Sequence, residues 1–151
     1  MTNDREVFQD ELRMLLKDPK VLQMRKIPQH GGTNTLRHSL AVAERAFALA
    51  EKFRWDIDEK ELARGALLHD YYLYDIKKEG YSAYHHGTSH PKKAAENAEQ
   101  DFGLTAKEKN IILGHMWPLT LRSVPSSKEA ALVCMADKDI AFKEMVLKKI
   151  Q

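Results

Sequence analysis

Apolar residues recur at helical spacing in almost every segment of this chain. Leu36, Leu40, Ala43, Phe47 and Ala50, for example, lie three or four residues apart, which is the period of one face of an α-helix. No segment alternates convincingly in the manner of a strand, and no internal repeat is visible. The pattern predicts an all-α protein, a bundle of about six helices. The expected helices cover residues 7–16, 35–54, 58–72, 90–102, 105–116 and 126 to the C-terminus.

The ends of these segments carry the usual boundary signals. Capping side chains are expected at Thr33 or Thr35, Asp58, Thr105 and Ser126 or Ser127. Pro91 predicts a helix start at residue 90, because a proline in the first helical position needs no N–H partner. Residues 75–89 form the longest irregular stretch, and loops of this length in small domains often serve function.

Composition and length restrict the possible classes of protein. A chain of 151 residues predicts one domain, residues 1–151, with a core large enough to need no disulfides. Lys plus Arg number 24 and Asp plus Glu 22, so the net charge of +2 indicates neither a nucleic-acid polymer nor a membrane as partner. The single cysteine, Cys134, excludes an intramolecular disulfide framework and indicates a reducing, cytoplasmic compartment. Neither a signal peptide nor a membrane span is recognisable.

Several ionisable residues lie on faces that are otherwise apolar. His38, the pair His69–Asp70, His115 and Asp137 each occupy such a position on a different expected helix. Taken singly, each has an ordinary structural explanation: a core histidine, a helix-end residue, or an aspartate paired with an arginine. Together they offer imidazoles and carboxylates from several helices to one interior point, which is how metal sites in helical bundles are built.

With His90, these residues follow the order H…HD…H…H…D, and the chain here resembles the HD superfamily of metal-dependent phosphohydrolases. The segments that carry the resemblance are HSLAVAERAFALA, ALLHDYYLYD, SHPKKAAENA, IILGHMW and VCMADKDIA. They place the ligand-bearing core at about residues 35–143 of a single HD-type domain. The resemblance implies that His38, His69, Asp70 and Asp137 bind a first metal ion. It also implies that His90 and His115 bind a second, with Asp70 bridging the two.

The implied cofactor is a pair of divalent transition metal ions. Imidazole and carboxylate ligands without thiolate suit Fe, Mn, Co, Ni or Zn. Two such cations neutralise phosphoryl charge and lower the pKa of water, which can then attack phosphorus. We therefore expect hydrolysis of a phosphoester or phosphoanhydride bond in a small, nucleotide-like molecule, with Asp70 and His69 as the catalytic pair. The sequence favours no oligomeric state.

Residues that contact the substrate are harder to predict. Many HD hydrolases follow the His-Asp pair with Ile-Gly-Lys, whose lysine can contact phosphate, whereas Tyr71, Tyr72 and Leu73 stand here. The candidates for substrate binding are Arg37, Lys138, His86 and Arg122, although each can equally be a solvated surface residue. The loop histidines, which include His30 and His85, are further candidates for a general acid.

Three other functions remain open at this stage. A mononuclear HD nucleotidase or phosphatase would use His90 and His115 outside the metal shell. A di-iron HD oxygenase would use the same ligands for oxygen chemistry. A non-catalytic HD signalling module is the third, but such modules usually lack ligands that are all present here.

Overall fold

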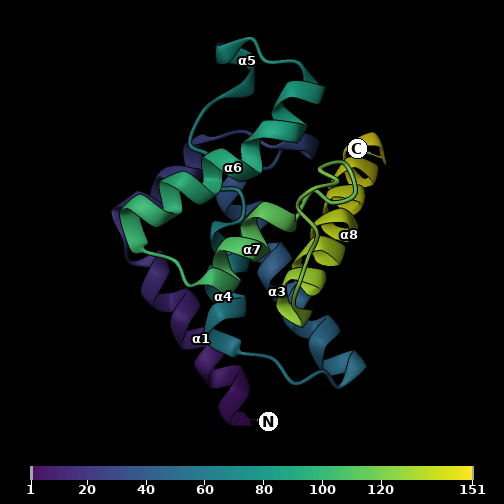
Figure 1. Cartoon of the computed structure of the whole chain (residues 1–151). Coiled ribbons are helices and arrows are strands. Elements are labelled where there is room, and N and C mark those ends of the chain that lie inside the picture. Colours follow the sequence, from purple (N-terminus) through teal and green to yellow (C-terminus); the bar gives the residue numbers. More distant parts are fainter. Residues whose placement is uncertain (1, 151) are drawn as a thin grey trace.

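The computed structural model describes residues 2–150, and within this range the chain forms α-helices and no strand (Figure 1). The all-α prediction is therefore confirmed. Within residues 2–150, six helices exceed one turn, as expected, and two one-turn helices, α2 and α5, add to them. The helices are α1 (Thr2–Leu16), α2 (Pro19–Leu22), α3 (Thr35–Phe53), α4 (Glu59–Leu68), α5 (Ile76–Glu79), α6 (Ala83–Phe102), α7 (Ala106–Gly114) and α8 (Lys128–Ile150). Two 3₁₀-helices, η1 (Gln23–Lys26) and η2 (His30–Gly32), lie between α2 and α3.

The start of α6 differs from the prediction. The helix begins at Ala83, capped by the Ser82 side chain, so Pro91 lies inside it and not at its first position. Most of the expected loop 75–89 is therefore helical. Residues 83–89 carry almost no apolar side chains, so periodicity gave no signal there. A proline inside a helix removes one backbone hydrogen bond, so proline usually marks the first turn of a helix. Applied to Pro91, this rule placed the start of α6 too late in the chain.

Two other boundaries are also corrected. Asn34 caps α3 by accepting a hydrogen bond from the backbone N–H of Arg37, where Thr33 or Thr35 had been expected. Helix α4 ends at Leu68 and not near Tyr72, so the His-Asp pair lies in the turn that follows it. The predicted caps at Asp58, Thr105 and Ser127 are confirmed by their side-chain hydrogen bonds to backbone N–H groups.

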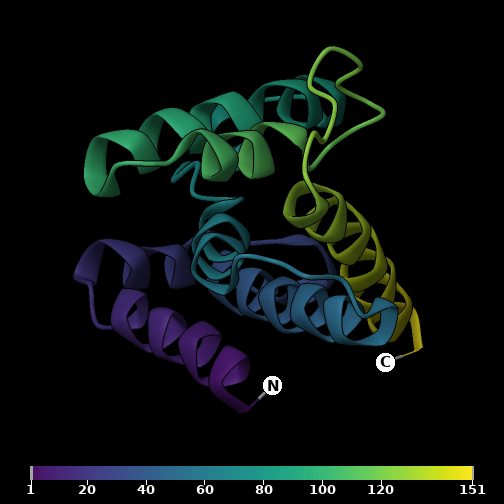
Figure 2. The same cartoon turned by 60° about the horizontal axis from the view of Figure 1, so that its bottom comes forward.

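Helix α4 forms the centre of the fold. It packs against α1 and α3 on one side and against α6 and α7 on the other, and it also touches α8 (Figure 2). Gly65 makes the close approach to α7 possible, because a Cβ at this position would lie 2.6 Å from Cδ1 of Ile111. The C-terminal end of α4 therefore delivers residues 69 and 70 into the interior of the bundle.

None of the helices within residues 2–150 is both long enough and apolar enough to cross a membrane.

Candidate metal centre

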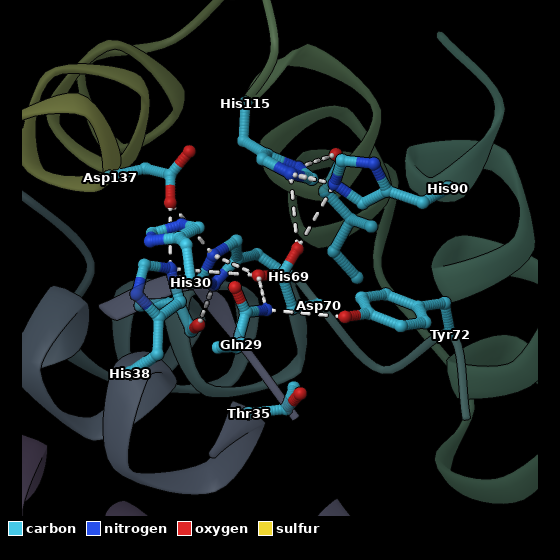
Figure 3. A network of polar contacts seen from close by, with 12 residues as sticks. Gln29, His30, Thr35, His38, His69, Asp70, Tyr72, His90, His115 and Asp137 are labelled. Carbon is cyan, nitrogen blue, oxygen red and sulfur yellow. Dashed lines mark hydrogen bonds and ion pairs between the residues drawn. The ribbon is translucent and has the colours of Figure 1, made fainter. Parts of the chain in front are cut away.

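The six predicted metal ligands meet in one place. They come from α3, the end of α4, α6, the end of α7 and α8, and their side chains point toward one another (Figure 3). Each is buried, with at most 8 % of its surface exposed. The set consists of His38, His69, Asp70, His90, His115 and Asp137.

Four of these residues form a first group. His38 Nε2 lies 2.9 Å from Asp137 Oδ1 and 3.5 Å from Asp70 Oδ2. His69 Nε2 lies 3.3 Å from each of the same two carboxylate oxygens. Two imidazole nitrogens and two carboxylate oxygens thus surround a single point.

The remaining two histidines form a second group with Asp70. Nε2 of His90 and Nε2 of His115 are 2.9 Å apart, and they lie 3.1 and 3.3 Å from Asp70 Oδ1. Asp70 therefore presents Oδ2 to the first group and Oδ1 to the second. This is the bridging position that the family resemblance implies.

Backbone carbonyls determine which ring nitrogen carries the proton in three of the four histidines. His69 and His115 cap α4 and α7, and the Nδ1–H of each donates to the carbonyl three residues earlier, Ala66 at 2.6 Å and Ile112 at 2.7 Å. Carbonyls in the last turn of a helix lack the N–H partner four residues on, so they can accept these bonds; the Ala66 carbonyl also accepts the backbone N–H of His69, at 3.4 Å. Because a carbonyl can only accept, Nδ1 of each ring carries a proton. Nε2 faces the centre, and it presents a lone pair there when the ring is neutral.

The same arrangement recurs at the other two histidines. The Nδ1–H of His90 donates to the carbonyl of His86 at 2.8 Å. His38 donates its Nδ1–H to a carboxylate, Glu144 Oε1, at 2.8 Å. All four rings therefore aim Nε2 inward, and fixing a histidine through its other nitrogen is the usual outer support of a metal ligand.

The carboxylates of the centre are ionised. Burial opposes the charge of Asp70, yet the charge of His69 and hydrogen bonds from neighbouring imidazoles hold the pKa of Asp70 well below its ordinary value. Burial also opposes ionisation of Asp137, but hydrogen bonds with His38 and His69 lower its pKa. Burial lowers the pKa of His38, and hydrogen bonds with Asp137 and Glu144 outweigh it and raise this pKa to about 9. The interior thus holds negative charge that attracts protons or other cations.

The second group makes the case for a metal ion more directly. Burial lowers the pKa of His115, which favours a neutral ring. Its Nε2 lone pair then faces Nε2 of His90 and an oxygen of Asp70, at 2.9 and 3.3 Å. A lone pair and a carboxylate oxygen at this distance are unfavourable for one another unless a proton or a metal ion lies between them.

The donor geometry fits transition metals. His69 Nε2 and Asp70 Oδ1 are buried polar atoms that lie 3.1–3.3 Å from oppositely charged or polar partners, but without the geometry of a well-formed hydrogen bond. Metal–ligand distances of about 2.0–2.2 Å place neighbouring ligands about 2.8–3.1 Å apart in an octahedral shell and about 3.3–3.6 Å apart in a tetrahedral one. The donor separations of 2.9–3.5 Å in the first group and 2.9–3.3 Å in the second lie in these ranges. The residues could therefore hold a metal ion through nitrogen and oxygen.

Two residues that support the centre were not predicted from the sequence. The amide of Gln29 donates to Asp70 Oδ2 at 2.9 Å, from a loop closed by an isolated bridge between Pro28 and Asn34. A lone glutamine in a loop gives no sequence signal. Glu144, the partner of His38, follows Asp137 by seven residues, and this spacing on a helix was a signal that could have been used.

The structure brings the predicted substrate residues together only in part. Lys138 lines a cleft of about 540 Å³ that reaches the metal centre at Asp137. His86 stacks on His90 with ring centroids 4.4 Å apart. Arg37 is exposed on the first turn of α3, and Arg122 lines a separate cleft that contains none of the six ligands. A role in substrate binding stays a prediction for all four.

Comparison with known proteins agrees with this geometry. The model of one protein family, described as HD domain, matches residues 35–141, most of the chain and all six ligands. The chain belongs to the HD domain family. No curated protein and no solved structure matches it. The HD domain is the core of a superfamily of metal-dependent hydrolases, and the buried histidines and aspartates of this HD domain are groups that could hold a metal ion.

Proposed function

We propose that this HD domain hydrolyses a phosphoester or phosphoanhydride bond of a small phosphorylated molecule, using two divalent metal ions. The observation that carries the proposal is Asp70, which has one oxygen in each of two groups of inward-facing imidazole nitrogens. The nucleotide-like character of the substrate and the cytoplasmic location stay predictions from the sequence.

Each residue of the centre has a definite task in this proposal. His38, His69, Asp70 and Asp137 would hold one ion, and His90, His115 and Asp70 the other. Such ions supply positive charge to phosphoryl oxygens and lower the pKa of water. Asp70 keeps the two positions at a fixed separation, and as an ionised carboxylate it can accept the proton of the attacking water. His69, whose ring is fixed by the Ala66 carbonyl, keeps its Nε2 directed at the first position.

The reaction is a simple hydrolysis. The water oxygen forms a bond to phosphorus while the bond from phosphorus to the leaving oxygen breaks. The leaving group takes up a proton and departs as an alcohol or a phosphate. The ammonium group of Lys138, beside the cleft, attracts the phosphoryl anion toward the centre.

The test combines metal analysis with phosphate release. The purified protein is supplied with Mn²⁺, Co²⁺ or Fe²⁺ and a panel of phosphomonoesters, diesters and anhydrides. We expect about two metal ions per chain and release of phosphate or of a phosphorylated product. Asp70→Asn keeps the size of the side chain but removes the charge shared by both groups, so it should abolish metal binding and hydrolysis together.

The matched control is Asp139→Asn, another aspartate-to-asparagine change. Asp139 lies on α8 close to Asp137, but it pairs with Arg45 and contacts none of the six ligands. This variant should keep both metal content and activity. Full activity in Asp70→Asn would refute the proposal. Oxygen consumption with iron and without phosphate release would instead support the oxygenase alternative.

A further inference from the structure

The cleft beside the metal centre is lined mainly by apolar side chains, whereas the centre itself is polar. Its volume is about 540 Å³, and Met116, Pro118, Leu119 and Ala141 supply its apolar lining. Leu119 lies close to α6. A Cβ on Gly87 would lie 3.0 Å from Leu119 Cδ2.

The polar side chains that line this cleft lie near the ligands and already have partners. Lys138 Nζ donates to the carbonyl of His115 at 3.2 Å and to Cys134 Sγ at 3.1 Å. His30 Nδ1 lies 3.5 Å from Glu144 Oε1. Among the lining residues, Lys138 is the one permanently charged cation. A second phosphate or a sugar hydroxyl in the cleft would lose its water and gain few hydrogen bonds, which is unfavourable.

The apolar surface continues along α8. A second cleft of about 600 Å³ shares His30 with the first, and Phe142, Met145 and Val146 line it. Its lysines, Lys148 and Lys149, lie at the far end of the helix from Asp137. Between the metal centre and the C-terminal end of α8, the side chains that line the two clefts are thus mainly apolar.

Resting on the phosphohydrolase function proposed above, we propose that the substrate is a phosphate monoester whose organic part is an uncharged, apolar group, in place of the nucleotide-like molecule expected from the sequence. The phosphoryl group binds at the centre, and the alkyl or aryl group lies against Met116, Leu119 and Ala141. Hydrolysis joins the water oxygen to phosphorus and breaks the ester P–O bond. Inorganic phosphate and an apolar alcohol, which takes up one proton, are the products.

Binding of alkylphosphonates tests this inference apart from catalysis, because their P–C bond has no ester oxygen to leave. Methyl-, n-butyl- and n-hexylphosphonate are titrated into the Mn²⁺-loaded full chain in a calorimeter. Each added methylene should strengthen binding about two- to fourfold, as expected for burial of hydrocarbon. 3-Hydroxypropylphosphonate has the size of the butyl compound, but it should bind about threefold more weakly or worse, because its hydroxyl loses water.

Two variants on the connector between α7 and α8 locate the effect. Leu119→Asn should reduce the gain in affinity per added methylene and leave methylphosphonate binding unchanged. Leu121→Asn is the matched control, because Leu121 is 73 % exposed and does not line this cleft. The control should behave as the wild-type chain does.

The outcomes separate this inference from the proposed function. Equal affinity for all chain lengths, or faster hydrolysis of adenosine 5′-monophosphate than of n-hexyl phosphate, would overturn the inference and leave the phosphohydrolase intact. Failure to bind any phosphonate, together with no phosphate release from any ester, would overturn both.

Discussion

Glu144 offers a sharp test of how the metal centre is held together. Its Oε1 accepts the Nδ1–H of His38 at 2.8 Å, while Nε2 of the same ring faces Asp137. His38 is 1 % exposed and the Glu144 side chain 16 %, so little water competes for this bond. We expect Glu144→Ala to release the ring and to populate the tautomer in which Nε2 carries the proton and cannot bind a metal ion.

The expected loss of metal affinity follows from the strength of the hydrogen bond between His38 and the charged Glu144. A hydrogen bond to a charged group contributes about 1.5–3 kcal/mol, which corresponds to a loss of about 10- to 150-fold in metal affinity. Loss of an outer partner of a ligating histidine typically costs about 10- to 100-fold, in agreement with this range. Glu144→Gln keeps an oxygen that can accept the same proton, so its metal affinity should fall between those of the wild type and Glu144→Ala.

Two measurements check this prediction. Competition with a chelating dye gives the affinity for Mn²⁺ or Co²⁺, and nitrogen chemical shifts of His38 report its tautomer. Asp139→Asn serves again as the control for loss of a carboxylate on α8 and should change neither quantity. The reasoning is wrong if Glu144→Ala binds metal within a factor of about two of the wild type. It is also wrong if His38 keeps its proton on Nδ1 in that variant.

Three further predictions, which use four variants, have clear expected outcomes. His115→Ala should reduce bound metal from about two ions to about one per chain, and an unchanged metal analysis would contradict the bridging arrangement. Gly31→Ala and Gly32→Ala both force an alanine into positive φ, but only the first would place a Cβ 2.6 Å from the carbonyl oxygen of Glu144. Urea unfolding should therefore show Gly31→Ala to be less stable than Gly32→Ala by about 1–3 kcal/mol. Asn34→Ala removes the cap of α3 and should lower the free energy of unfolding by about 1 kcal/mol, without changing metal content.

Most of the buried cluster of histidines and aspartates could be predicted because its signal is local. A histidine or aspartate on an apolar helical face is costly unless it has a partner, and this makes residues such as His38 and Asp137 conspicuous in the sequence. The order in which these residues occur along the chain indicated the resemblance to the HD superfamily. The helical pattern was equally local. It missed residues 83–89 ahead of Pro91, where apolar residues are scarce, and it misplaced the start of α1 and the end of α4.

The supporting partners and the walls of the cleft were decided by tertiary structure. Gln29 and Asp70 are 41 positions apart, and His38 and Glu144 are 106 apart, so no local periodicity links them. The division of the two oxygens of Asp70 between two groups likewise depends on how the end of α4 enters the bundle. Which side chains are available for chemistry follows from the amino-acid sequence alone. Only packing decided what holds them in place and what kind of molecule can approach them, because both depend on contacts between segments distant along the chain.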